Sequence, residues 1–368
     1  MKYLVKMTPL EQYAFGDDQG FKYPGEKGTG KESYLVRSRE LPEQTTILGL
    51  LRYLVLQDQK MLKTDFQYTE EERARMKQYI GAESFSFSSN ELQNFGYIHE
   101  ISPVFLVNDK EEILIRNPFH NKAKSGYSPI QMEEGTTDTS AGNIALPKIG
   151  EYSAKDGYAS GYYNLATGEI ENNLFQTNLV SGNRKNAPTD SDEDGYFKRE
   201  LKLLKKGYSF AVFADVEKLP ENAIGYMGKK KCAFSIEMKK VDDIDHLWFP
   251  VKSPSFLQET KKVDDIDLVG MVRELFKEND ETWYYALSDI VIDENTSYDN
   301  FCIVEEKHQR NLETIYSETS HLKKLRKSEI RYNLIQSGSV FYKSCHLKLN
   351  NKNCEQIGYN KIVQLGGN

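Results

Sequence analysis

The sequence has few of the features that mark secreted, membrane-spanning or metal-binding proteins. Its four cysteines form no Cys-x-x-Cys pair, so their spacing indicates neither a zinc knuckle nor a disulfide framework. No apolar run approaches the roughly 20 residues that a helix needs to cross a bilayer. Residues 1–6 are too short and too charged a stretch to form a secretion signal. These absences predict a cytoplasmic protein with no membrane partner.

Catalytic motifs are also missing from the sequence. The six histidines show neither the His-Glu-x-x-His pattern nor any other spacing of metal ligands. No Gly-x-Ser-x-Gly elbow occurs, and no Lys-Ser or Lys-Thr pair follows the C-terminal glycines as in a Walker-type phosphate loop. The sequence therefore predicts no catalytic residue, no bound metal and no cofactor.

One internal repeat is exact, since residues 239–245 recur as residues 261–267. Each copy contains an Asp-Asp-x-Asp cluster, and carboxylates of this kind suit Mg²⁺ or Ca²⁺. The second copy, however, directly precedes a predicted helix with an apolar face over residues 268–276. Acidic residues are favoured at the start of a helix by its dipole, so a local duplication with a capping role explains the pattern without a metal.

The composition is that of a soluble globular protein, with 39% hydrophobic and 28% charged residues. A length of 368 residues allows two domains. The net charge of −7 argues against bulk binding of nucleic acid, although the distribution of charge matters more than its sum. Residues 198–240 hold 11 Lys/Arg against 5 Asp/Glu, residues 321–361 hold 9 against 2, and residues 241–306 hold 5 against 17. This pattern fits separate basic and acidic faces, and it also fits plain solvated surface.

The N-terminal segment predicts two strands separated by a long loop. Residues 2–8 alternate apolar and charged side chains, which is typical of an edge or near-edge strand, and Pro9 ends it. Residues 14–33 are rich in Gly, Lys and Asp and predict the loop. Residues 33–39 predict a second strand, which brings Arg37 and Arg39 toward the first helix.

The first helix is the clearest secondary-structure prediction. Thr45 or Thr46 is expected to cap it, an apolar stripe runs from Ile47 to Val55, and it ends near Gln57-Asp58. A glycine inside a helix costs about 1 kcal/mol relative to Ala. Gly49 therefore predicts a close neighbour that tolerates no side chain, either a sheet or a ligand.

The middle of the chain alternates between regular and irregular patterns. Residues 70–79 predict a charged helix, and residues 103–115 predict a hairpin that turns at Asn108-Asp109. Residues 117–195 lose regular periodicity, and insertions of this length are usually functional or disordered. Within them, residues 181–195 predict a mobile tip.

Regular patterns return after this insertion. Residues 198–201 and 208–213 predict two strands paired around a turn at Lys206-Gly207. Residues 290–335 predict a further helix with a run of basic residues.

Two glycine-containing segments are candidates for contacting phosphate. Gly228 is followed by Lys229, Lys230 and Lys231 and then by a predicted strand, which is a plausible phosphate-binding turn. Near the C-terminus, small residues at Gly358, Asn360, Gly366 and Gly367 flank a short apolar strand. Glycine and asparagine tolerate positive φ, and glycine lets another backbone approach closely. These residues predict either a glycine-rich hairpin that ends a domain or a backbone platform for RNA, on which Tyr359 stacks a base.

The C-terminal segment resembles the glycine-rich loop of the RAMP superfamily of CRISPR proteins, and several other segments match in the same order. The loop at residues 15–21, the Pro-x-x-Thr helix at residues 42–52 and the Ser-Pro-x-Phe segment at residues 248–256 are similar to motifs of that family. The Gly-Ser-Val-Phe-Tyr strand at residues 338–342 resembles the branch that forms the third subunit of the type III-B (Cmr) effector complex. The turn at residues 225–231 departs from the family's Gly-Gly-x-basic pattern, because Tyr226-Met227 separates the glycines.

The resemblance implies an α+β fold of two ferredoxin-like (RRM-like) domains. Residues 1–205 are expected to form the first, with a thumb-like insertion at residues 117–195 whose hairpin comes from residues 120–150. Residues 206–368 are expected to form the second. The implied function is non-catalytic binding of the crRNA 5′ handle, beside the large polymerase/cyclase subunit and the backbone RAMP subunit. The residues expected to bind RNA are Arg37, Arg39, Thr45, Thr46, Gly49, Arg52, Gly228, Lys229, Lys230, Lys231, Gly358, Tyr359, Asn360, Lys361, Gly366 and Gly367.

Two other functions stay open at this point. The first is that of a guide-processing RAMP endoribonuclease, which uses a histidine as general acid or base. His120 is the best candidate for that role because polar residues surround it in the sequence, and its alternative is a surface histidine with no function. The second is that of a structural scaffold whose basic turns touch no RNA.

Overall fold

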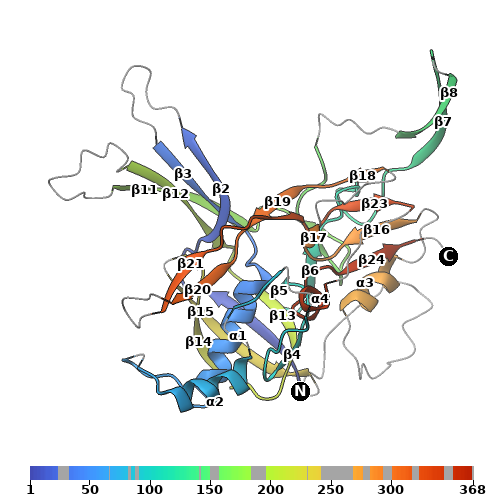
Figure 1. The fold of residues 1–368 in the computed structure, drawn as a ribbon. Coiled ribbons are helices and arrows are strands. Elements are labelled where there is room, and N and C mark those ends of the chain that lie inside the picture. The colour runs from blue at the N-terminus through green and yellow to red at the C-terminus, as the bar shows by residue number, and fades with distance from the viewer. Residues whose placement is uncertain are drawn as a thin grey trace.

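The fold is known from a computed structural model of the full chain. The described residues are 1–23, 33–65, 67–81, 84–87, 91–140, 142–149, 157–183, 196–229, 231–241, 268–276, 282–292, 301–316, 323–343 and 351–366. They form an α+β protein, as predicted, and the sheets are mostly antiparallel with few helices (Figure 1). Within these ranges, none of the helices combines the length and the apolarity that a membrane span requires.

The largest sheet has nine strands and forms the centre of the molecule. Its order is β10-β9-β6-β5-β13-β1-β15-β14, with β4 also paired to β13. The bounds are β1 Lys2–Pro9, β4 Ile98–Ile101, β5 Phe105–Asn108, β6 Ile113–Arg116, β9 Tyr162–Asn164, β10 Ile170–Glu171, β13 Tyr208–Val216, β14 Asn222–Met227 and β15 Cys232–Lys240. Strand β5 pairs with β13, so this sheet spans the domain boundary expected between residues 205 and 206.

Residues 2–8, predicted as an edge or near-edge strand, do form a strand, but it does not lie at the edge, because β15 and β14 lie outside it. Strand β1 pairs with β13 on one side and with β15 on the other, so it lies inside the sheet. Its side chains serve two cores on opposite faces. Tyr3, Val5 and Met7 pack into one core and Leu4 packs into the other. Both faces of β1 are therefore covered, although the alternation of its side chains is typical of a strand with one face in water.

Different elements cover the two faces of this sheet, and helix α1 (Gln44–Asp58) lies on one of them. The apolar stripe of α1 packs against the face that carries Val5 and Met7, and α2 (Glu70–Ile80) contacts α1. The other face is covered by α3 (Leu268–Phe276) and by a four-stranded sheet in the order β18-β23-β16-β24. The bounds of that sheet are β16 Trp283–Ala286, β18 Cys302–Ile303, β23 Val340–Tyr342 and β24 Ile362–Leu365. The predicted ranges of α1, α2 and α3 are confirmed to within about two residues.

A second four-stranded sheet extends from the body as an arm (Figure 1). Its order is β11-β12-β3-β2, and β12 runs parallel to β3. The bounds are β2 Phe15–Tyr23, β3 Ser33–Arg39, β11 Phe175–Asn183 and β12 Tyr196–Leu204. The prediction of a loop over residues 14–33 is therefore wrong for β2. The predicted pairing of residues 198–201 with residues 208–213 is also wrong, because β12 belongs to the arm and β13 to the central sheet.

The insertion contains a long hairpin that also projects from the body (Figure 1). Strands β7 (Met132–Thr139) and β8 (Gly142–Ile149) pair along their whole length. This confirms a hairpin within residues 120–150, although most of the tip predicted at residues 181–195 lies outside the described residues.

The described part of residues 290–335 contains strands, so the helix predicted there is wrong. They are β17 Ile290–Ile292, β19 Glu306–Gln309, β20 Leu312–Tyr316, β21 Lys323–Lys327 and β22 Tyr332–Ile335, in addition to β18. The basic residues from Lys323 to Lys327, which were predicted to be helical, form strand β21, and this strand pairs with β20. Pairing between the two strands overrides the local helix propensity of these residues. A short helix, α4 (Lys352–Gln356), precedes the C-terminal glycine segment.

Candidate nucleic-acid interface

The basic glycine turn joins β14 to β15, as predicted, and rests on the chain that follows β1. Gly228 has φ +73°, and a Cβ there would lie 2.5 Å from the carbonyl oxygen of Ala14. The backbone N–H of Lys229 donates to the same oxygen at 2.8 Å. Lys231 also has positive φ, at 52°. The turn is therefore held tightly against residue 14, and only glycine fits at position 228.

The side chain of Lys229 lies across Gly16 at the start of the arm. A Cβ on Gly16 would come within 2.6 Å of Cε and 3.2 Å of Nζ of Lys229. Next to the turn, the ring of Tyr226 is 53% exposed. Lys230 lies outside the described residues. The turn thus places a basic group beside an exposed aromatic ring, a combination that suits single-stranded RNA.

The two arginines of β3 have different environments. Arg37 is exposed, whereas the side chain of Arg39 is only 9% exposed and forms ion pairs with Glu43 and Asp17. Burial lowers the pKa of Arg39, but the carboxylates of Glu43, Asp17 and Asp289 more than offset this, so its pKa is raised. Arg39 is committed to these carboxylates, and of the pair only Arg37 is presented at the surface.

Glu43, rather than Thr45 or Thr46, is the N-cap of α1. The backbone N–H groups of Thr46 and Ile47 donate to its carbonyl oxygen, and no side chain caps the helix. Its carboxylate is buried and also receives Lys307, whose Nζ lies 2.7 Å from Oε1. Burial acts to raise the pKa of Glu43, but Lys307 and Arg39 lower it to about 2. A helix start that carries such an ion cluster offers no open site for phosphate.

The C-terminal glycine segment packs against this same helix start. The ring of Tyr359 is fully buried, and its hydroxyl donates to Oε2 of Glu43 at 2.9 Å. A Cβ on Gly358 would lie 1.9 Å from Nε2 of Gln44 and 2.6 Å from the carbonyl oxygen of Ser102. The prediction that Tyr359 stacks on a base is wrong, because burial and this hydrogen bond hold its ring inside the protein.

The neighbouring residues of this segment are also engaged within the chain. Asn360 has φ +60°, and its Oδ1 accepts the backbone N–H of Val291 at 2.8 Å. Nζ of Lys361 lies 3.5 Å from a carboxylate oxygen of Glu100. Gly366 is buried at φ +71°, and Gly367 lies outside the described residues. The positive φ angles predicted for this segment are confirmed at three positions, but there they turn the chain inside the fold.

Within α1, Gly49 and Arg52 have different environments. Gly49 is exposed, and a Cβ there would meet no described atom within 4 Å, so no described strand lies close to it and the predicted neighbouring sheet is wrong. Arg52 is 9% exposed, with its guanidinium 5.8 Å from the centre of the Phe95 ring. Burial lowers the pKa of Arg52 to about 10.

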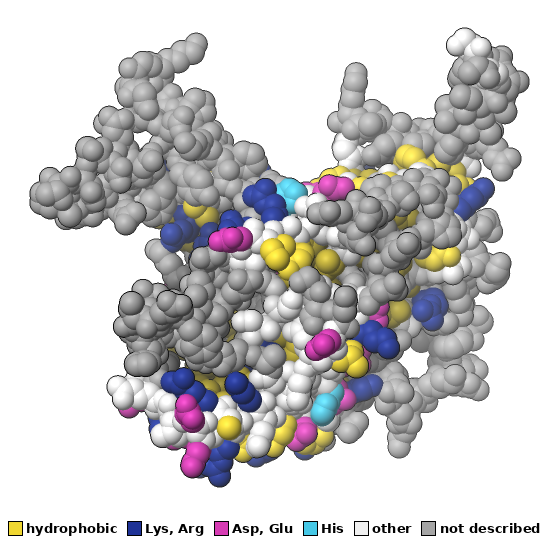
Figure 2. All heavy atoms as spheres, in the orientation of Figure 1, with side chains coloured by type: hydrophobic (Ala, Val, Ile, Leu, Met, Phe, Trp, Pro, Cys, Tyr) yellow, Lys and Arg dark blue, Asp and Glu magenta, His cyan; other side chains and the backbone are white. Residues whose placement is uncertain are grey.

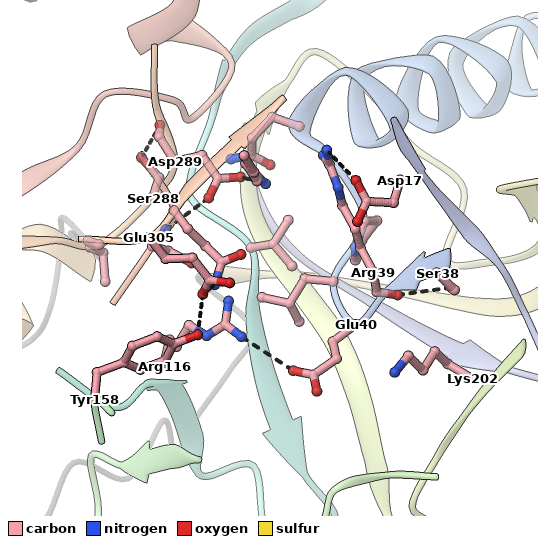
Figure 3. A pocket seen from close by; sticks show the side chains of 18 residues that line it. Asp17, Ser38, Arg39, Glu40, Arg116, Tyr158, Lys202, Ser288, Asp289 and Glu305 are labelled. Atoms are coloured by element: carbon pink, nitrogen blue, oxygen red, sulfur yellow. Dashed lines mark hydrogen bonds and ion pairs between the residues drawn. The ribbon is translucent and has the colours of Figure 1, made fainter. Parts of the chain in front are cut away.

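A cavity of about 240 Å³ lies where the end of β3 and the start of α1 meet residues 287–289, 305–307 and 336–337 (Figure 3). Its lining includes as many acidic as basic side chains, and it is crossed by the ion pair of Arg116 with Glu40 at 3.6 Å. Tyr158 donates to Glu305, and both side chains lie near Arg116 on one side of the cavity (Figure 3). Because the charges are balanced and paired, this cavity joins two parts of the chain and does not favour an anion.

Basic side chains do not form a continuous band on the face shown in Figure 2. Among the described residues, Lys and Arg lie interspersed with Asp and Glu. Most of the acidic segment 241–306 lies outside the described residues, so separate basic and acidic faces stay a prediction.

His120 is not a surface residue. It is fully buried, its Nε2 lies 2.6 Å from the hydroxyl of Tyr127, and its ring centre lies 4.4 Å from that of Trp283. Burial lowers its pKa to about 3. A buried, neutral imidazole is a poor general acid at neutral pH. No group of three or more His, Cys, Asp or Glu side chains is placed to hold a metal in the part of the chain that the structure describes. The Asp-Asp-x-Asp clusters fall outside that part.

Residues 5–264 match the family model of the CRISPR-associated protein Cas_Cmr3, which spans the central sheet, α1, the insertion and the basic turn. The chain belongs to this family. The family predicted from the sequence motifs is thereby confirmed.

The Cas_Cmr3 chain is also similar to solved structures of CRISPR complexes. One is a chain of the type III-B Cmr-beta complex bound to cognate target RNA, with 14% identity and a TM-score of 0.46, covering 100% of this chain and 98% of that one. Another comes from the same complex bound to cognate target RNA and AMPPnP, with 14% identity and a TM-score of 0.44, covering 99% and 98%. A comparison with curated protein sequences gives no match.

Sequence reasoning missed the residues that organise the centre of this Cas_Cmr3 chain. Glu43, Lys307 and Asp289 form one ion cluster, although they are up to 264 residues apart. The only local signal was an acidic residue between Pro42 and the helix, which is a favourable position near a helix N-terminus. The sequence offered no sign that Lys307 would meet it.

Proposed function

We propose that this protein is a non-catalytic crRNA-binding subunit of a type III-B CRISPR effector complex. The observation that carries the proposal is the match of residues 5–264 to the Cas_Cmr3 family. In this role it holds the 5′ handle of the crRNA and docks on the large polymerase/cyclase subunit and on the backbone RAMP subunit. The two ferredoxin-like domains implied by the resemblance, and a thumb role for the β7–β8 hairpin, belong to the same proposal.

The basic glycine turn is the proposed phosphate contact. Lys229 and Lys231 stand on a tightly fixed turn beside the exposed ring of Tyr226, and Arg37 is exposed on the adjoining arm. The C-terminal glycine segment supports RNA binding indirectly, because it fixes the start of α1. We therefore assign the RNA contacts to the turn and the arm, and the remaining predicted residues to the scaffold behind them.

The first test is to replace all three lysines of the turn with Ala. Each lost phosphate contact reduces the log–log dependence of single-stranded RNA affinity on salt by about 0.7, so the slope should fall by about 2. Fluorescence anisotropy over a salt series measures this on the assembled complex and on the isolated chain. A matched control replaces Arg73, Arg75 and Lys77, which are exposed on α2, and removes the same charge. An equal fall in both variants would assign the effect to net charge alone and contradict the proposed contact.

The second prediction concerns catalysis. Labelled repeat RNA incubated with the pure protein should stay intact, with or without Mg²⁺, because His120 is buried and neutral. Denaturing gel electrophoresis of the RNA measures this directly. Cleavage at one site that disappears in His120→Ala, with the variant still folded, would favour the endoribonuclease function instead.

A further inference from the structure

One edge of the arm is a long strand that carries no charged residue. Strand β11 (Phe175–Asn183) has nine residues, and among the described strands it pairs only with β12 (Figure 1). Its register with β12 is continuous over its whole length, without a bulge. The sequence of β11 contains neither a charged residue nor a proline. An open edge of this kind presents a row of backbone N–H and C=O groups to which another strand can pair.

The other long edge strands are protected in ways that β11 is not. Strand β2, at the opposite edge of the arm, contains charged residues, and its pairing with β3 shifts register between Gly16 and Gly20. Strand β7 contains acidic residues, and β8 contains a proline and a lysine. Strand β14 also lacks charged residues but is shorter, at six residues. Charges, prolines and bulges keep an edge from pairing, so β11 has the edge that is best suited to receive a strand.

Apolar side chains of β11 are exposed on both faces of the arm. Leu179 is 59% exposed and Val180 is 42% exposed, and they point to opposite faces because successive residues of a strand alternate. Leu203 on β12 lies opposite Gln176, hence on the same face as Val180, and is 40% exposed. Exposed apolar groups beside an open edge favour a strand whose own side chains are apolar on that face. The strand that pairs with β11 should therefore be apolar on the face of Val180.

The opposite face of β11 carries a lysine that forms no ion pair with any described residue. Lys202 on β12 lies opposite Thr177, and its Nζ donates to the hydroxyl oxygen of Thr177 at 2.8 Å. The ammonium group therefore extends over β11 toward the open edge. Glu200, on the same face, accepts the backbone N–H of Ser38 at 3.3 Å, which directs its carboxylate toward β3 instead. A carboxylate on an added strand can reach Lys202, because side chains of paired strands lie about 5 Å apart.

The charges at this edge favour a strand from a different protein over a second copy of β11. A second copy would bring no carboxylate to Lys202, because β11 contains no acidic residue. It would instead bring a second Lys202 to the same pair of strands. A strand that is acidic on one face and apolar on the other complements both Lys202 and Val180. The edge therefore selects for a segment of alternating acidic and apolar residues.

We propose that β11 is a docking edge for an extended segment of another protein, which adds a strand to the arm. The segment alternates acidic and apolar side chains, so that a carboxylate reaches Lys202 and apolar side chains cover Val180 and Leu203. Hydrogen bonds between the two backbones supply affinity, and the alternating side chains supply specificity. The arm and the basic glycine turn belong to different sheets, so this inference does not depend on the RNA contacts proposed above.

The first measurement uses the full chain and a defined peptide. An acetylated peptide that alternates Glu and Val over the length of β11 should bind with a Kd on the order of 10–100 µM by fluorescence anisotropy. Lys202→Glu, checked for folding by thermal unfolding, should weaken this binding about tenfold or more, because repulsion replaces attraction. A peptide that alternates Lys and Val should show the reverse preference and bind Lys202→Glu more tightly than the wild type. Lys77→Glu makes the same charge change at an exposed position on α2 and should stay within about threefold of the wild type.

Hydrogen exchange of the β11 amides tests the pairing itself. The N–H groups of an edge strand point alternately to its neighbour and to the open side, so every second β11 amide should exchange fast in the isolated chain. The Glu–Val peptide should slow this fast set and leave the amides that bond to β12 unchanged.

Three results would overturn the proposal. The first is a peptide that leaves the fast amides unprotected or binds Lys202→Glu as tightly as the wild type. The second is protection of these amides by single-stranded RNA but not by the peptide, which would make β11 a nucleic-acid site. The third is their protection by self-association of the chain, detected by analytical ultracentrifugation, which would make a second copy the occupant. None of these results changes the salt slope expected for the lysine turn, so the two proposals fail separately.

Discussion

Replacing Glu43 with Ala is expected to lower the free energy of unfolding by about 3–5 kcal/mol. The carboxylate is buried and lies between the cationic groups of Arg39 and Lys307. Without this carboxylate, Arg39 and Lys307 each lose an anionic partner at a site with little access to water. The hydroxyl of Tyr359 also loses the oxygen to which it donates. The start of α1, β19 and the C-terminal glycine segment all meet at this carboxylate, so its loss acts on three parts of the chain together.

The same carboxylate should give the protein a recognisable loss of stability in acid. Its pKa is lowered from 4.5 to about 2 in the folded state. A carboxyl group with a lowered pKa contributes stability that is complete above its unfolded value and is lost as the pH falls through its folded value. The stability difference between the wild type and Glu43→Gln should therefore be largest above about pH 4.5 and should shrink toward about pH 2.

Urea unfolding of both variants at several pH values measures these effects. Glu237→Gln is the matched control, because Glu237 is 41% exposed in its ion pair with Lys6 and should cost less than about 1 kcal/mol. A Glu43→Ala protein within about 1 kcal/mol of the wild type would show that the cluster does not hold these elements together.

Local patterns were enough to locate the helices and hairpins of this fold but not the partners of its strands. The spacing of the apolar residues from Ile47 to Val55 predicted α1 correctly, because a helix is specified by residues that are close in the sequence. The charged residues of β1 indicated an edge or near-edge strand, yet Lys6 lies between two neighbouring strands, β13 and β15. Its Nζ lies 3.1 Å from Glu237 on β15 and 3.6 Å from Glu111 in the β5–β6 turn. The charge of Lys6 is thus neutralised by residues more than 100 positions away in the sequence. A pattern of neighbouring residues cannot predict such partners.

The candidate site was partly predicted for the same physical reason. The turn at residues 228–231 is a local structure, and its glycine could be recognised from the residues beside it. Tyr359 lies between two small residues, which in the sequence indicated exposure. Its buried hydroxyl binds Glu43, which lies 316 residues earlier in the sequence. The spacing of apolar residues around Tyr359 cannot predict a contact over such a distance.

Replacing Gly358 with Ala is expected to destabilise the protein by about 2–5 kcal/mol, from backbone strain and overpacking together. The residue has φ +93°, which an L-amino acid rarely adopts. Its new Cβ would meet Nε2 of Gln44 at 1.9 Å and the carbonyl oxygen of Ser102 at 2.6 Å. These two groups are joined by a hydrogen bond of 2.8 Å, so the side chain of Gln44 cannot move away without breaking its bond to the partly buried carbonyl of Ser102.

Gly49→Ala is the matched control, because it makes the same chemical change in the helix that Gly358 packs against. Position 49 is exposed, and no described atom lies within 4 Å of the added Cβ. Ala in a helix interior is more favourable than Gly by about 0.5–1 kcal/mol, so this variant should be more stable than the wild type. Urea unfolding of the two variants should thus give changes of opposite sign. If Gly358→Ala is as stable as Gly49→Ala, the C-terminal segment does not hold the start of α1. RNA binding by Gly358→Ala, corrected for the folded fraction, should then match the wild type, since residue 358 faces the interior of the protein and not the RNA.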